Sequence, residues 1–109
     1  MIPNVNSLRE AVQYVIKNNS DAGYRPTYFI QDTSCPDREL PGRCIKLIHS
    51  QNALISVYSA LERFPEMITL EDFVARYGED WNLPPDTISI AQESVDTFNQ
   101  RWPNRVYKE

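Results

Sequence analysis

The chain has 109 residues, 41% of them hydrophobic, and a formal net charge of −4. This length fits one domain covering residues 1–109, and the hydrophobic content excludes a chain that stays disordered. No run of residues approaches the roughly 18 apolar positions of a membrane-spanning helix. The opening residues, MIPNVNSLRE, also lack the basic and apolar regions of a secretory signal. We therefore expect a single compact cytoplasmic domain that does not enter a membrane.

The first predicted helix covers SLREAVQYVIKNN, residues 7–19. Ser7 stands at its N-cap position and Glu10 follows at the spacing of a capping box. Apolar residues then recur at the spacing of one face of an amphipathic helix: Leu8, Ala11, Val12 and Val15.

Two segments in the middle of the chain are predicted to be strands, TYFIQDT (27–33) and RCIKLIH (43–49). Both are rich in aromatic or branched residues and are bounded by turn-forming residues. The run SCPDRELPG (34–42) between them is expected to be a connecting loop, so the two strands could pair as an antiparallel ribbon.

Two further helices are predicted for SQNALISVYSALERF (50–64) and ITLEDFVARYG (68–78). The first is apolar around much of its circumference, which predicts the most buried helix of the fold. In the second, Thr69 stands at the N-cap, Asp72 at the third helical position, and Gly78 after the last turn.

A last helix is predicted for PPDTISIAQESVDTFNQRW, residues 84–102. Its apolar residues step by three and four positions, which forms a narrow seam that covers one neighbouring helix. We expect that neighbour to belong to the same chain, and a homodimer through residues 86–102 is the alternative. The seam consists of Ile88, Ala91, Val95, Phe98 and Trp102.

Together these elements predict an α+β fold of about four helices and a two-stranded antiparallel ribbon, in the order αββααα. A two-stranded ribbon is marginal in water by itself, so it would have to lie on the helices. If the ribbon does not form, the fold is mostly helical.

Charge is concentrated between Glu62 and Asp96, where nine acidic residues face two basic ones, Arg63 and Arg76. An anionic face repels a phosphate backbone and complements a basic protein, so we expect a protein partner rather than nucleic acid. A surface that only keeps the chain in solution is the alternative. The residues assigned to the partner-binding face are Glu66, Glu71, Asp72, Glu79, Asp80, Trp81 and Asp86.

The segment CPDRELPGRC (35–44) contains both cysteines. A disulfide between Cys35 and Cys44 would close the loop and stabilise the fold by about 2–3 kcal/mol, although a reducing cytosol disfavours it. The cysteines are too far apart in sequence for a zinc knuckle, so no metal site is assigned. A thiol nucleophile could use His49 as its base and Asp32 to orient that base. The simplest interpretation is a connecting loop whose cysteines are structural.

No sequence motif for catalysis or cofactor binding is present, and we assign no catalytic residue and no cofactor. The chain has isolated glycines instead of a phosphate-binding loop, and neither HExxH nor GxSxG occurs. We interpret it as a protein-interaction or regulatory module that uses the acidic helical face within residues 62–96. One alternative is a DNA-binding helix-turn-helix regulator, because residues 60–78 have that rhythm and residues 100–108 combine basic with aromatic side chains. The other alternative is a small thiol-dependent enzyme.

Overall fold

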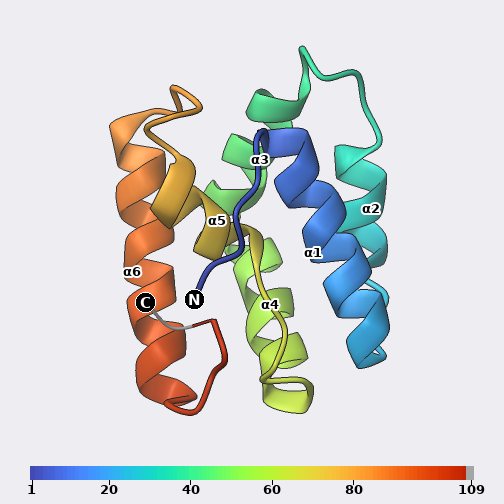
Figure 1. Ribbon diagram of the computed structural model, residues 1–109, viewed down its shortest axis with the longest axis vertical. Coiled ribbons are helices and arrows are strands. Elements are labelled where there is room, and N and C mark those ends of the chain that lie inside the picture. The colour runs from blue at the N-terminus through green and yellow to red at the C-terminus, as the bar shows by residue number, and fades with distance from the viewer. Residues whose placement is uncertain (108–109) are drawn as a thin grey trace.

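The computed structural model describes residues 1–107, and this part of the chain forms six helices and no strand (Figure 1). The helices are α1 (Leu8–Ala22), α2 (Thr27–Thr33), α3 (Leu40–His49), α4 (Gln51–Arg63), α5 (Leu70–Tyr77) and α6 (Pro85–Arg101). They pack into one compact domain in which α5 contacts α1, α3 and α6, while α6 lies at one edge of the molecule (Figure 1). No helix within this described part is both long enough and apolar enough to cross a membrane.

The predicted ribbon is wrong, because residues 27–33 form α2 and residues 43–49 lie within α3. The run LPG, assigned above to the connecting loop, is the first turn of α3. Proline fits there because the N–H groups of a first turn have no acceptor within the helix. The fold is therefore all-α, and the expected α+β order αββααα does not hold.

Helical packing explains why α3 forms. Leu40, Cys44 and Ile48 follow at four-residue spacing, and all three are buried on one face of the helix. Short runs of branched and apolar residues fit a strand or a buried helix equally well, so the run itself did not distinguish the two. In α2, the hydroxyl of Thr33 donates to the carbonyl of Phe29 at 2.6 Å, a bond that only a helical turn brings together.

The predicted starts of two helices are confirmed. Ser7 caps α1, with its hydroxyl accepting from the backbone N–H of Glu10 at 3.1 Å. Thr69 and Asp72 form a complete capping box at the start of α5. The end of α1 requires glycine, because Gly23 has a φ of 103° that residues with a Cβ rarely adopt.

Helix α4 is not the most buried helix, although its apolar circumference predicted that it would be. Of its 13 residues only Ala60 and Leu61 are buried, and Ile55 is 62% exposed. The central position belongs instead to the shorter α5, whose Phe73 and Val74 are fully buried.

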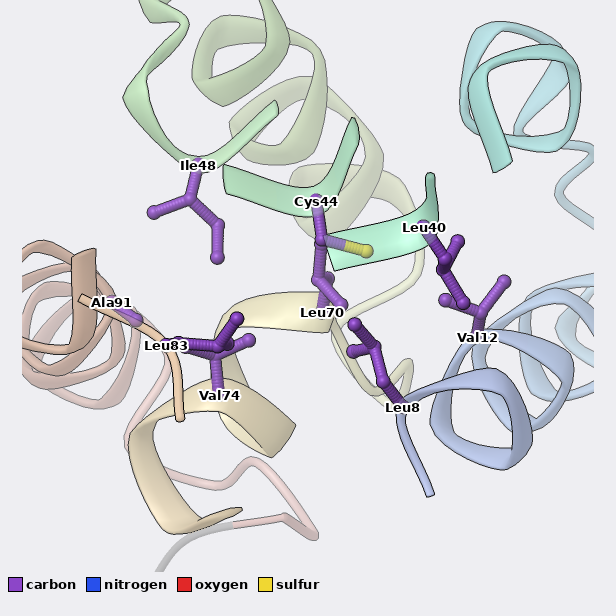
Figure 2. Packing of buried hydrophobic residues seen from close by; sticks show 9 residues of the cluster. All are labelled: Leu8, Val12, Leu40, Cys44, Ile48, Leu70, Val74, Leu83 and Ala91. Carbon is purple, nitrogen blue, oxygen red and sulfur yellow. The ribbon is translucent and has the colours of Figure 1, made fainter. Parts of the chain in front are cut away.

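The main hydrophobic cluster joins α1, α3, α5 and α6, and it includes the loop that precedes α6 (Figure 2). Its buried members are Leu8, Val12, Leu40, Cys44, Ile48, Leu70, Val74, Leu83 and Ala91. The seam of α6 packs inside the chain, with Ala91, Val95 and Phe98 buried. The same chain therefore covers these three seam residues, while Ile88 and Trp102 are half-buried.

The joint between α5 and α6 is tight at Gly78. A Cβ at this position would lie 2.6 Å from the carbonyl oxygen of Val74 and 2.7 Å from Cγ1 of Ile88. Gly78 has a helical φ of −56°, which any residue can adopt. Glycine is therefore required by the close approach of the two helices and not by the backbone conformation.

Candidate interaction surface

The seven residues assigned to the partner-binding face separate into buried and exposed groups. Glu71 and Asp72, in the first turn of α5, are 6% and 2% exposed. Trp81 is half-buried. The exposed residues are Glu66, Glu79, Asp80 and Asp86.

Asp72 is part of a buried ion pair. Its Oδ2 accepts from the backbone N–H and the hydroxyl of Thr69, at 2.9 and 3.0 Å. The same oxygen accepts from Nη2 of Arg105 at 2.6 Å, and both charged side chains are fully shielded from solvent. Asp72 thus accepts hydrogen bonds from both the start of α5 and the C-terminal segment, and no partner can reach it in this fold.

Arg105 finds further partners in the same pocket of the core. Its guanidinium donates to the carbonyl of Met67 and to Oδ1 of Asn99, and it lies 5.5 Å from the ring centre of Phe98. Its Nε has no partner among the described residues. A buried cation needs such partners to offset the loss of hydration.

Glu71 is buried beside this pair, and its surroundings disfavour its charge. Burial raises its pKa to about 7, and the neighbouring charge of Asp72 adds to the rise. Its own backbone N–H and the hydroxyl of Thr69 act in the opposite direction but do not compensate. Glu71 therefore titrates near neutral pH inside the fold.

Five exposed acids lie on the α5–α6 connection and on α6, the helix at the edge of the molecule (Figure 1), whereas the exposed Glu66 lies apart from them between α4 and α5. We call these five the outer acidic face: Glu79, Asp80, Asp86, Glu93 and Asp96. Residues 78–100 contain these five acids and no Lys, Arg or His. Glu93 and Asp96 were not in the predicted partner-binding set, although helical spacing places them away from the α6 seam, at exposed positions.

Glu62 belongs to the acid-rich stretch of the sequence but not to this face. Its carboxylate accepts from Arg101 at 2.9 Å and from the indole N–H of Trp102 at 3.2 Å. These two hydrogen bonds lower the pKa of Glu62. Its charge is thus already balanced within the chain.

Trp81 does not stand out as an exposed anchor. Its ring stacks on Tyr77 with centroids 5.4 Å apart, and it packs against the two clusters around α5. The loop that carries it continues through Asn82, whose φ of 56° lies in the left-handed region. A groove of about 540 Å³ opens where this loop meets α6, and its lining residues are Glu79, Asn82, Leu83, Pro85 and Ile88.

The cysteines are both free thiols. Cys44 is completely buried, and burial raises its pKa to about 12, with the nearby Cys35 as a second cause. Its thiol is therefore neutral at pH 7 and a poor nucleophile. His49 is hydrogen-bonded to Thr87 of α6, with Nε2 and Oγ1 2.9 Å apart.

Arg9 of α1 holds the segment between α2 and α3. It donates to the carbonyl of Thr33 at 2.7 Å, to the carbonyl of Cys35, and to the carboxylate of Asp37 at 2.8 Å. The loop that contains Cys35 is thus anchored by an arginine. Across residues 1–107, no three His, Cys, Asp or Glu side chains are grouped so that they could hold a metal ion.

The residues that suggested DNA binding are largely occupied within the fold. Arg101 pairs with Glu62, Arg105 is buried against Asp72, and the hydroxyl of Tyr107 accepts from the amide of Asn18 at 2.9 Å. Lys108, the last basic residue of the predicted tail, lies outside the described residues. The helix that follows the helix-turn-helix-like segment is α6, whose exposed side carries the acids named above.

Comparison with known proteins adds no relative: no family model matches the chain, and no curated protein or solved structure does.

Proposed function

We propose that this protein is an interaction module that binds a basic protein segment at the outer acidic face. The observation that supports this most strongly is the stretch of residues 78–100, which exposes five carboxylates and contains no cation. A concentration of charge of one sign raises the local potential, attracts an oppositely charged partner and speeds its association.

The helix that carries most of this face is rigidly held. The inner side of α6 is buried against α5 and α3, so its outer side presents carboxylates from a fixed backbone. A pre-organised surface loses less conformational entropy when a partner binds. By contrast, the acids buried in α5 are excluded from the proposed surface.

The proposal is tested with a fluorescein-labelled octa-arginine peptide, whose binding is followed by anisotropy at low and physiological salt. The variant Asp86→Asn/Glu93→Gln/Asp96→Asn removes three charges from the face, and we expect it to weaken binding by about tenfold or more. The wild-type affinity should also fall as salt rises, because screening shortens the reach of exposed charges.

The matched control is Glu10→Gln/Asp21→Asn/Glu39→Gln, which changes the net charge equally at exposed sites on α1 and beside α3. It should bind the peptide nearly as well as the wild type. Equal losses in the two variants would mean that net charge alone acts, and no binding by the wild type at low salt would remove the proposal.

The two alternatives have less support from the geometry. A DNA-binding regulator would need cations on the exposed side of α6, where acids stand instead. A thiol-dependent enzyme would need a thiolate beside its base, whereas Cys44 is buried and protonated at pH 7 and the hydrogen bond of His49 goes to Thr87.

A further inference from the structure

The groove between the α5–α6 loop and the first turns of α6 borders the outer acidic face. It is an open groove with a volume of about 540 Å³. The groove has an apolar side and a polar side. Leu83, Pro85 and Ile88 supply apolar surface, while Glu79 and Asn82 supply polar atoms.

The apolar side of the groove is held by the core beneath it. Leu83 is 5% exposed and its side chain packs beside Val74 and Ala91 (Figure 2). Ile88 lies directly against Gly78, at the tight joint of α5 and α6. Core packing therefore fixes the part of the groove that Leu83 and Ile88 line.

No cation is among the described residues that line the groove. Glu79 is the one charged residue among the described residues that line it, and no basic residue occurs from position 78 to position 100. Asp80 and Asp86 are exposed acids next to the lining residues Glu79 and Pro85 in sequence. A positively charged group on an apolar stem would therefore complement the groove.

We infer that this groove receives an arginine side chain of the basic partner, an inference that rests on the proposed function. The three methylenes of arginine would lie along Leu83, Pro85 and Ile88, as the stems of long cationic residues do on apolar surfaces. The guanidinium would pair with the carboxylate of Glu79 through two parallel N–H donors, and a further N–H would reach the side-chain carbonyl of Asn82. Arginine fits better than lysine because its planar group makes such paired contacts and is less strongly hydrated.

The experiment compares two variants that each remove one exposed negative charge. Glu79→Gln alters the groove, whereas Glu93→Gln alters the outer side of α6. With labelled octa-arginine, we expect Glu79→Gln to weaken binding about tenfold and Glu93→Gln about twofold or less. Octa-lysine should bind the wild type less tightly than octa-arginine, and Glu79→Gln should abolish this preference.

A second readout reports on the groove directly. The ¹³C-methyl NMR signals of Leu83 and Ile88 should shift when octa-arginine is added to the wild type and should shift much less in Glu79→Gln. Equal losses of affinity in the two single variants, or unshifted methyl signals in a wild-type protein that still binds, would overturn the groove assignment and leave the proposed function standing. Absence of octa-arginine binding by the wild type would remove both.

Discussion

Two pairs of neighbouring acids stand at opposite ends of the short helix α5, and their environments differ. Glu71 and Asp72 begin α5 and are buried, whereas Glu79 and Asp80 follow its end and are exposed. Backbone N–H groups and the positive end of the helix dipole favour carboxylates at the start of a helix, while the carbonyl end disfavours them. The second pair therefore remains in water, where it adds to the outer acidic face, and the first pair becomes part of the core.

The strongest test of this difference removes the cation that allows Asp72 to be buried. Arg105→Ala leaves an unpaired carboxylate inside the fold, and we expect a loss of about 3–5 kcal/mol in the free energy of unfolding. Urea unfolding followed by circular dichroism measures it. Arg101→Ala, which breaks the exposed pair with Glu62, is the matched control and should cost at most about 1 kcal/mol. Similar costs for both variants would show that the buried pair contributes no more than a surface pair.

We expect the next largest loss of stability from a substitution at Gly78, at the end of α5 between the two pairs of acids. Gly78→Ala forces a Cβ against the carbonyl of Val74 and the side chain of Ile88, and we expect it to destabilise the protein by about 1–3 kcal/mol. Gly42→Ala is the control, because a Cβ there meets nothing within 4 Å inside α3. It should leave stability unchanged or raise it by up to about 1 kcal/mol. If both alanines are tolerated alike in thermal unfolding, the tight approach of α5 and α6 is not needed.

The smallest expected effect depends on pH and separates Glu71 from Glu79. Because the pKa of Glu71 is raised to about 7 in the fold, the folded chain keeps a proton that the unfolded chain releases near pH 4.5. Its contribution to stability is therefore fully present below about pH 4.5 and is lost as pH rises through 7. Glu71→Gln removes this loss, and we expect it to stabilise the protein by about 1–2 kcal/mol at pH 8 relative to its effect at pH 5.

Glu79→Gln is the exposed counterpart of that variant, and its effect on unfolding should stay within about 0.5 kcal/mol at both pH values. Denaturant midpoints at pH 5 and pH 8 for both variants provide the measurement. A Glu71→Gln variant whose effect does not change with pH would contradict the burial of an ionisable group at this position.

The local part of this architecture follows from sequence patterns, and the long-range part does not. The cap at Ser7, the capping box of Thr69 and Asp72 and the seam of α6 are all set by neighbours a few residues away, and the structure contains each of them. The segments of α2 and α3 were predicted to be strands because a short apolar run fits the two-residue period of a strand as well as the 3.6-residue period of a helix. Only packing against the core selects the helix.

The same limit applies to the candidate surface. The local pattern places Asp72 in a capping box and Asp80 after the end of the helix, but it does not show that Asp72 is buried. The partner that buries Asp72 is Arg105, 33 residues further along the chain. The exposed positions on α6, in contrast, lie opposite an apolar seam and can be identified from the sequence by helical spacing alone.

The sparse cover of α4 has a consequence for the motions of the chain. A helix in which only Ala60 and Leu61 are buried, and the other apolar residues are half-buried or exposed, loses less packing than α5 when it separates from the rest, so we expect its opening to require less free energy. Backbone amides of α4 should therefore exchange with deuterium before those around Phe73 and Val74. If so, α4 opens locally while the centre of the fold stays closed.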